Sequence, residues 1–312
     1  MTETTKVIFE KYQVRKNKKQ KAAFREYVKE IADRYGYECK LEKGSFGARN
    51  IVIGNPDTAK VLYTAHYDTC PRLPFPNFIT PKSFLFYLLY QLLILGLFFA
   101  VALAGGFLSG VIIALLPIDE DIAYELIACV PMLIYWVLLF LILDGPANKH
   151  TANDNTSGVT TVLDIMAELP QDQRGKVAFV LFDLEEVGLF GSSSFASKHK
   201  AIKKNALVIN FDCVSDGATM LFALKRTTVK YAELLEKAFI STPDVTVDIA
   251  KKAFYPSDNV SFNGGIGVAA LKKSKRFGML YMDRIHTNKD VIYREENIRF
   301  LTEGAVKLAQ LL

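Results

Sequence analysis

Residues 177–193 read VAFVLFDLEEVGLFGSS, a run of apolar, β-prone residues that ends in two adjacent glutamates and a glycine-containing turn. The run predicts a buried strand. Charged residues lie mostly on protein surfaces, so the simplest reading of an acidic pair at a strand end is that it is solvated, or that one carboxylate caps the next helix. Whether Glu185 and Glu186 do more depends on which other side chains reach the same place.

Short apolar runs and amphipathic segments alternate along most of the chain. Further runs of strand character lie at 50–54, 60–68, 206–212, 266–271 and 276–283. Helical patterns lie at 18–36, 156–169, 192–200, 229–240 and 295–312. Alternating strands and helices predict an α/β fold, in which helices cover both faces of a mostly parallel central sheet.

A different kind of region begins after residue 82. No charged residue occurs from Ser83 to Ile118. The apolar run at 84–104 has 21 residues, and a helix of that length crosses a hydrocarbon layer of ~30 Å. A second apolar run, at 126–143, follows the acidic loop at 118–121. Two such runs around a short loop favour a transmembrane hairpin over buried helices of a soluble core.

The stretch between residue 84 and the acidic loop is longer than one straight span requires. Glycine weakens a helix, so we expect the helix to break at Gly105, Gly106 or Gly110. Pro131 lies inside the second run, and transmembrane helices tolerate proline better than soluble helices do.

The charges near the hairpin indicate its orientation. The basic residues closest to its outer ends are Arg72, Lys82 and Lys149, whereas the loop between the runs contains only acids. By the positive-inside rule, both flanks then lie in the cytoplasm and the loop lies outside. The expectation is an integral membrane protein, in the plasma membrane, whose main domain is cytoplasmic.

The overall composition narrows the class of partner. The net charge is a modest +5, and the basic run RKNKKQK at 15–21 is read as the solvated face of an early helix, with a contact to anionic lipid as the alternative. No basic motif with interleaved aromatic residues is present, so a nucleic-acid partner is not expected. The four cysteines are scattered without a CxxC pair, which argues against a disulfide framework or a zinc ribbon and fits a reducing compartment.

Histidines and acids follow the predicted strands at one end. In open α/β sheets, ligands bind beyond the carboxyl ends of the strands. Among only four histidines in the chain, two fall at such positions. The residues concerned are His66 and Asp68, Glu185 and Glu186, Asp212, His286, and Asp154 in the turn TANDNTSG at 151–158. We expect these side chains to meet at one edge of the sheet.

Together, these residue types are suited to two metal ions. One cation takes His66, Asp154 and Asp212, and the other takes Glu186, His286 and the bridging Asp154. Each ion then has three protein ligands and room for a shared water, as in catalytic sites. Buried acids without cations would repel one another strongly. Nitrogen and oxygen ligands suit zinc, and cobalt or manganese would also bind.

The two remaining acids have separate roles in this scheme. Residues i and i+2 of a strand point the same way, so Asp68 is expected to accept a hydrogen bond from the second ring nitrogen of His66 and to orient that ring. Glu185 is adjacent to a ligand without being one. It is placed to take a proton from the metal-bound water and to pass it to a leaving amine.

Five short motifs, in this order, resemble those of the co-catalytic zinc aminopeptidases of the bacterial leucyl aminopeptidase and aminopeptidase Y type (clan MH), to which glutamate carboxypeptidase is related. They are HYD at 66–68, NDNTSG at 153–158, DLEEVGLFGS at 183–192, NFD at 210–212 and IHTNKD at 285–290. The resemblance implies a mixed sheet of about eight strands sandwiched by helices. It also implies a cis peptide bond between Asp154 and Asn155.

The roles of the family's residues carry over to matching positions. The resemblance implies that Glu185 is the general base and Asp68 the orienting acid. It implies that the metal ligands are His66, Asp154, Glu186, Asp212 and His286.

The chain also departs from the family pattern. In YPSDNVSF, at 255–262, Asn259 stands where the family usually has histidine, and Tyr255 is a candidate to stabilise an oxyanion or contact the substrate. His150 and His199 are read as surface residues. The apolar hairpin lengthens the segment between His66 and Asp154. Both must reach one site, so the number of membrane crossings must be even.

The predicted protein is therefore a membrane-anchored di-metal exopeptidase, most simply an aminopeptidase that hydrolyses N-terminal peptide bonds with a metal-bridging hydroxide and a glutamate base. Its expected domain organisation is one discontinuous peptidase domain, 1–82 and 145–312, with a transmembrane hairpin at 83–144. Expected partners are peptide substrates and the lipid bilayer, and the oligomeric state is left open. The alternatives are an inactive receptor or scaffold of the same fold, a related carboxypeptidase, or a glutaminyl cyclase.

Overall fold

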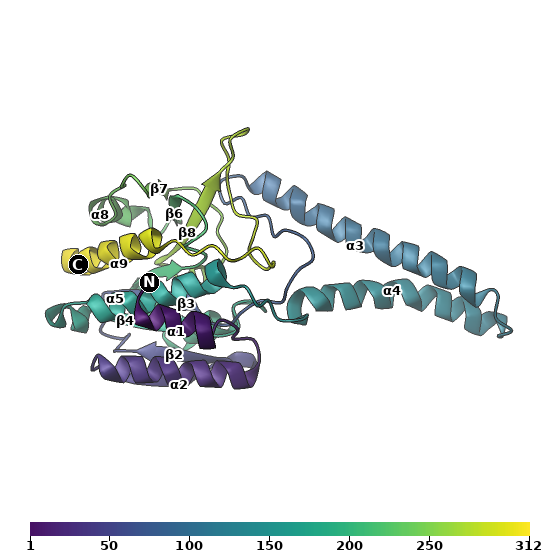
Figure 1. Ribbon diagram of the computed structural model, residues 1–312, viewed down its shortest axis with the longest axis horizontal. Coiled ribbons are helices and arrows are strands. Elements are labelled where there is room, and N and C mark those ends of the chain that lie inside the picture. The colour runs from purple at the N-terminus through teal and green to yellow at the C-terminus, as the bar shows by residue number, and fades with distance from the viewer.

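A computed structural model describes residues 1–312 and contains one large mixed sheet (Figure 1). The strand order is β1-β2-β4-β3-β5-β8-β6-β7, and β9 pairs with the end of β8. The strands are β1 (Cys39–Lys43), β2 (Arg49–Ile53), β3 (Val61–His66), β4 (Val177–Phe182), β5 (Leu207–Phe211), β6 (Thr219–Ala223), β7 (Thr246–Ala250), β8 (Gly265–Lys273) and β9 (Leu280–Tyr281). The central strands β4, β3, β5 and β8 are parallel neighbours, and β2 and β6 flank them in antiparallel orientation. This sheet confirms the predicted fold class.

Helices cover both faces of the sheet because successive strand residues point to opposite sides. The helices of this part are α1 (Glu3–Lys11), α2 (Lys18–Arg34), α5 (Gly158–Glu168), α6 (Phe190–Lys198), α7 (Lys200–Asn205), α8 (Ala232–Ala238) and α9 (Glu295–Leu311). Tyr63 and Phe179 belong to the larger core, which contains residues of α1, α2, α5, α8 and α9. Their neighbours Leu62 and Val180 belong to a second core on the other face, with residues of α6 and α7.

Some elements were not predicted, or differ from the predicted ones. The strands β1, β6 and β7 and the helix α1 had no prediction, and only two residues of the run at 276–283 form a strand, β9. The edge strand β1 reads CKLEK and none of its residues is buried, so it offers no apolar run to recognise. It is a strand because it pairs with β2, and its residue pattern does not reveal that pairing.

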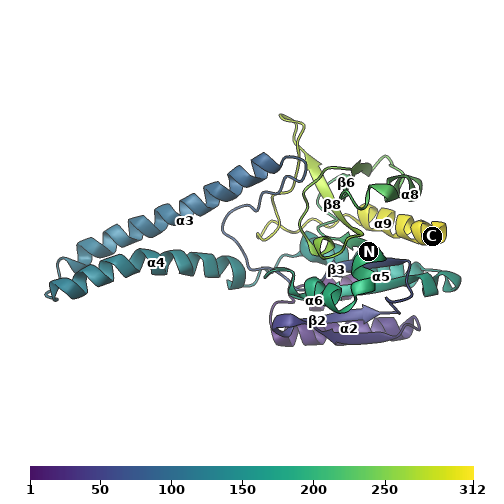
Figure 2. The same cartoon turned by 180° about the vertical axis from the view of Figure 1, so that it is seen from behind.

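The apolar region forms two long antiparallel helices that project away from the sheet (Figures 1 and 2). They are α3 (Phe84–Ile113) and α4 (Glu120–Asp144), and together with their connection at 114–119 we call them the hairpin. Both helices are long and apolar enough to cross a membrane by length and composition. Most of the exposed large hydrophobic side chains of the protein lie on the hairpin.

The predicted break at Gly105, Gly106 or Gly110 is wrong, because α3 runs unbroken to Ile113. These glycines instead allow α3 and α4 to approach closely. A Cβ atom at Gly106 would lie 2.3 Å from Cγ of Pro131 on α4. Small residues at such contacts are typical of packed membrane helices.

Two contacts position the base of the hairpin relative to the rest of the molecule. Pro71 and Ala147 form an isolated antiparallel bridge, so the two ends of the insertion meet. On the other side, the ring of Phe254 packs edge-on against Phe84 of α3, with the ring centroids 5.2 Å apart. The hairpin is thus placed directly beside the edge of the sheet where the central strands end.

The prediction that the basic run at 15–21 forms a solvated helix face is only partly correct. Lys18 and Lys19 are exposed, but Arg15 is fully buried and Lys21 is buried in an ion pair with Asp183, at 2.7 Å. Two of the basic side chains therefore stabilise the interior close to the ends of β3 and β4.

Candidate metal centre

The candidate ligands meet at one edge of the sheet, and the strand order explains why. The strands β4, β3 and β5 are adjacent and parallel, so their carboxyl ends lie side by side. His66 is the last residue of β3, Glu185 and Glu186 follow β4, and Asp212 follows β5.

Two further candidates reach this edge from turns. Asp154 lies in the turn before α5, where the carboxylate of Asp290 accepts hydrogen bonds from the backbone N–H groups of Asn153, at 2.7 Å, and Asp154, at 3.0 Å. The peptide bond from Asp154 to Asn155 is cis, as the family resemblance implied. His286 follows β9 with a φ of 61°, a left-handed conformation that is uncommon outside glycine.

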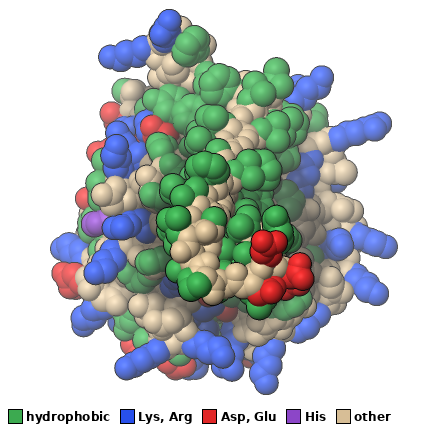
Figure 3. Space-filling view, turned by 90° about the vertical axis from the view of Figure 1, so that its right-hand side faces the viewer, with side chains coloured by type: hydrophobic (Ala, Val, Ile, Leu, Met, Phe, Trp, Pro, Cys, Tyr) green, Lys and Arg blue, Asp and Glu red, His purple; other side chains and the backbone are tan.

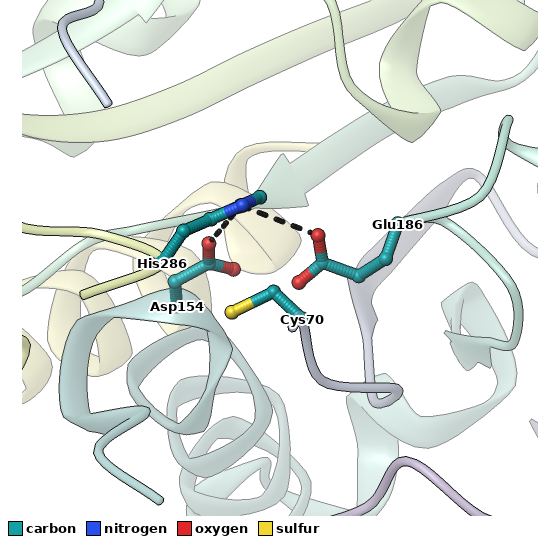
Figure 4. Close-up of side chains that lie close together, drawn as sticks. All are labelled: Cys70, Asp154, Glu186 and His286. Atoms are coloured by element: carbon teal, nitrogen blue, oxygen red, sulfur yellow. Dashed lines mark ion pairs between the residues drawn. The ribbon is translucent and has the colours of Figure 1, made fainter. Parts of the chain in front are cut away.

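Asp154 lies between the two histidines, with one carboxylate oxygen toward each. Its Oδ1 is 3.3 Å from Nε2 of His66, and its Oδ2 is 3.0 Å from Nε2 of His286. Nε2 of His66 is also 3.5 Å from Oδ1 of Asp212. Nε2 of His286 is 3.3 Å from Oε2 of Glu186 (Figure 4). The structure thus brings all five predicted ligands together, in two groups that share Asp154.

These separations fit zinc. Nitrogen and oxygen ligands that lie ~2.0 Å from a tetrahedral zinc ion are about 3.3 Å from one another. The distances within the two groups run from 3.0 to 3.5 Å. The donor set, imidazole nitrogen with carboxylate oxygen, is also one that zinc accepts. The residues present therefore fit the zinc ions that the sequence predicted.

The electrostatics of the site call for positive charge. Burial raises the pKa of Glu185 and of Glu186 well above the usual range of a glutamate when only protein groups surround them. Oε1 of Glu186 is buried without a hydrogen-bond partner. A carboxylate oxygen that is withdrawn from water and left unpaired is costly, and a bound cation would remove that cost.

Asp68 is tied to the glutamate pair more closely than to the histidine ring. Its carboxylate accepts hydrogen bonds from the backbone N–H groups of Glu185, at 3.1 Å, and Glu186, at 3.3 Å. Nδ1 of His66 is 3.6 Å from this carboxylate but 3.1 Å from the backbone carbonyl oxygen of Asp68. Asp68 therefore contacts the ring of His66 through its backbone carbonyl and the turn at Glu185 and Glu186 through its carboxylate.

A buried cation that the sequence pattern did not reveal, Arg15, lies close to the site. The guanidinium of Arg15 is fully buried, and burial lowers its pKa to about 10. Its Nη1 donates to Oγ1 of Thr156 at 3.2 Å, and its backbone N–H donates to Oγ1 of Thr69 at 3.0 Å. Arg15 thus holds the segment after β3 close to the turn that carries Asp154. No periodic pattern distinguishes it from the exposed lysines beside it in the sequence.

Asp290 and Cys70 were missed as well, although both carry a recognisable signal. Asp290 is the last residue of the motif IHTNKD, and its carboxylate orients the turn of Asp154. Cys70 follows His66 and Asp68 at the same two-residue spacing, and its sulfur lies in the group of Asp154, Glu186 and His286.

A cavity of about 300 Å³ opens onto the site, and residues of the hairpin line part of it. Glu185, Tyr255 and the five candidate ligands line its inner end. Its outer wall includes Phe75, Phe254 and five hairpin residues, namely Tyr87, Tyr90, Gln91, Ile94 and Ile142. None of the lining residues is a lysine or an arginine.

The other sequence candidates lie as follows. Tyr255 is buried, and its hydroxyl donates to the backbone carbonyl of Asp212 at 3.0 Å. His150 is exposed. His199 is half-buried away from the site and lies 2.8 Å from the carboxylate of Glu42.

Many solved structures resemble this fold, and three of them follow. The LapA aminopeptidase of Legionella pneumophila is 15% identical, with a TM-score of 0.56 over 98% of this chain and 69% of that one. The glutaminyl cyclase of Porphyromonas gingivalis is 16% identical, with a TM-score of 0.60 over 99% and 96%. A Zn-dependent exopeptidase of Parabacteroides distasonis is 15% identical, with a TM-score of 0.59 over 98% and 96%. At these identities, the likeness shows the fold alone.

The sequence profile of Peptidase family M28 matches residues 139–303, which contain four of the five candidate ligands as well as Glu185. The fifth, His66, lies before the matched region and is brought to the site by β3. Since the match spans more than half of the chain and the fold agrees with it, this chain belongs to Peptidase family M28, a family of zinc peptidases.

Proposed function

We propose that this protein is a membrane-anchored di-zinc aminopeptidase. The observation that carries the proposal is the position of Asp154, whose two oxygens face two separate histidine–acid groups at 3.0–3.3 Å. A carboxylate in that position is suited to bridge two ions. His66 and Asp212 would complete one site, and Glu186 and His286 the other.

The bound ions would supply Lewis acidity, which activates water and polarises the scissile carbonyl group. The chain's own residues do the rest. Glu185 lines the cavity beside the ligands, and burial raises the pKa of its carboxyl group above the usual range of a glutamate, which favours uptake of a proton. Its carboxylate would accept a proton from the attacking water and donate it to the leaving amine. Hydrogen bonds from its backbone and that of Glu186 to Asp68 hold the pair in place.

The cavity favours the N-terminus of a peptide over its C-terminus. A carboxypeptidase needs a cationic partner for the terminal carboxylate of its substrate, for which arginine is best suited. The cavity has neither lysine nor arginine in its lining, so it offers no such partner. A volume of about 300 Å³ suits a terminal residue rather than a chain that passes through.

The hairpin supports membrane anchoring. Its exposed apolar side chains would be unfavourable in water and favourable in lipid. Figure 3 views the molecule end-on from the hairpin side, with acids at the hairpin tip and Lys and Arg side chains around the rim of the molecule. That arrangement matches the positive-inside rule with the peptidase part in the cytoplasm. We propose this orientation, with both helices as membrane spans.

The experiment is to measure zinc content and turnover of the protein purified in detergent. Substrates are amino-acid anilides, the same anilides with a blocked amino group, carboxy-terminal dipeptide substrates, and a peptide with N-terminal glutamine. We expect about two zinc ions per chain and cleavage of the unblocked anilides only. Cyclisation of the glutamine peptide alone would identify a glutaminyl cyclase, and no turnover with any substrate would favour a scaffold.

Glu185→Gln tests the assigned base. It should lower kcat by about 10²- to 10⁴-fold while the zinc content stays unchanged. Glu236→Gln, at an exposed position of α8, is the matched control and should behave as the unaltered protein. Normal turnover by the Glu185→Gln variant would remove Glu185 from the mechanism.

A further inference from the structure

The group around His286 contains a fourth side chain that the family pattern does not supply. Sγ of Cys70 lies with the ligand atoms of Asp154, Glu186 and His286, all within 4.8 Å of one another. Figure 4 shows the sulfur between the two carboxylates, with the ring of His286 on the far side of them. Cys70 is fully buried, and this group contains no second cysteine with which it could form a disulfide.

The position of Cys70 is fixed by its neighbour in space, Asn148. The backbone N–H of Asn148 donates to the Cys70 carbonyl at 3.1 Å, and the side-chain nitrogen of Asn148, which donates to the carbonyls of His150 and Thr287, lies 3.9 Å from Sγ of Cys70. Both contacts fix the sulfur at the base of the hairpin. Oε1 of Glu186, in the same group, is buried and unpaired. A cation bound in this group would satisfy that unpaired oxygen.

Cys213 is a second buried cysteine near the site, and it differs from Cys70 in the direction of its hydrogen bond. The thiol of Cys213 donates to Oδ1 of Asp212 at 3.1 Å. Its sulfur therefore keeps its proton, and it lies in neither group of candidate ligands. The two cysteines form a natural pair of test and control.

We propose that Cys70 is a thiolate ligand of the ion held by Asp154, Glu186 and His286. The inference rests on the proposed di-zinc function. When the ion binds, the S–H bond breaks, a sulfur–metal bond forms, and the proton passes to solvent without any change of oxidation state. This ion then has four protein ligands, whereas the ion held by His66, Asp154 and Asp212 keeps an open position.

Charge balance agrees with this assignment. The shared site contains the carboxylates of Asp154, Glu186 and Asp212, and a Cys70 thiolate adds a fourth negative charge. Two divalent cations are then neutralised by the protein alone. A site closed by four protein ligands is the arrangement of structural zinc, and an open one is the arrangement of catalytic zinc. The two ions would therefore have different roles, and thiolate would favour zinc over manganese at the closed site.

Cobalt substitution tests the proposal, because a thiolate bound to cobalt gives a charge-transfer absorption band that oxygen and nitrogen ligands do not give. The cobalt-loaded protein should show this band. Cys70→Ser should lose it, and Cys213→Ser should keep it. If the band is present in both variants or missing from the unaltered protein, Cys70 is not a ligand.

X-ray absorption at the zinc edge of the unaltered protein gives an answer that does not depend on whether the variants fold. One of the two zinc ions should have a sulfur neighbour at about 2.3 Å. Absence of sulfur scattering from a protein that holds two zinc ions and turns over anilides would overturn this inference alone. Failure to bind zinc at all would overturn the proposed function.

Discussion

The metal centre and the hairpin reverse the usual arrangement of polar and apolar groups in opposite ways. At the ends of the central strands, acidic side chains are withdrawn from water, among them Asp154 at 3% exposure. On the hairpin, large apolar side chains are left open, such as Trp136 at 64%. Each reversal is unfavourable in water by itself.

Under the proposed function, each region is stabilised by a partner of a particular kind. Cations would stabilise the two groups of buried acids, because the attraction of each carboxylate to a cation outweighs the repulsion between the carboxylates. In the proposed membrane-anchored protein, lipid would cover the apolar helices, most of whose large side chains remain exposed although the two helices pack against each other. The cavity joins the two regions, since Asp154 and Ile142 of α4 both line it. The predictions below test whether the two regions depend on their partners as expected.

The largest effect is expected from Asp154→Asn. The amide keeps the shape of the side chain but removes the charge that both groups share. We expect zinc content to fall from two ions to one or fewer, and turnover to fall on the order of 10³-fold or more, several kcal/mol of transition-state stabilisation. Zinc analysis and anilide turnover measure this. Asp172→Asn, at an exposed position, is the control, and two retained ions in the Asp154→Asn variant would refute the bridging role.

A smaller effect is expected when residues 76–146 are replaced by a short Gly-Ser loop. The chain ends meet at the bridge between Pro71 and Ala147, so the loop can close without moving the sheet. The variant should be soluble without detergent and should still bind zinc. Its kcat/KM for anilides of large apolar residues should fall about tenfold, because part of the cavity wall is lost. Unchanged kcat/KM for every anilide would mean that the hairpin only anchors the protein.

Two single substitutions within the intact hairpin sharpen that result. Ile94 lines the cavity at 9% exposure, whereas its neighbour Leu93 points outward at 57%. Ile94→Ala should lower kcat/KM for large apolar anilides, and Leu93→Ala should not. Equal behaviour of the two variants would show that the cavity wall on α3 does not contact the substrate.

Much of the site could be predicted from the sequence because parallel strands end at a common edge. His66, Glu186 and Asp212 each follow an apolar run, and the run itself predicts where the side chain goes. The unusual backbone conformation of the site could not be predicted from the sequence. Leu184 and Cys213, next to these residues, have φ values of 58° and 57°, and no pattern of residue types predicts such turns.

The contacts that sequence reasoning missed join segments far apart in the chain. Arg15 donates from its Nε to the backbone carbonyl of Tyr67, and β1 becomes a strand only by pairing with β2. In the hairpin, the composition predicted the two helices, but glycine alone did not reveal whether it breaks a helix or packs against another. That depends on the partner helix, which for Gly106 presents Pro131.

The smallest effect is expected from a substitution at the contact between Gly106 and Pro131. It tests whether glycine here allows two helices to pack closely. In Gly106→Leu, the new side chain would meet Pro131, where even a Cβ atom would lie 2.3 Å from Cγ. Overpacking of this kind lowers the free energy of unfolding by about 1–3 kcal/mol. In detergent, the helical circular dichroism signal of the Gly106→Leu variant should therefore begin to fall at a lower temperature than that of the unaltered protein.

Gly96 provides the matched control on the same helix, because a Cβ atom there would have no other atom within 4 Å. Leucine is a better helix former than glycine by up to ~1 kcal/mol, so Gly96→Leu should leave the hairpin as stable as before or slightly more stable. The free energy of unfolding should change in opposite directions in the two variants, because only Gly106 faces the other helix at close range. If both variants are equally stable, α3 and α4 are not packed at Gly106, and the close approach of the two helices is not what keeps α3 unbroken.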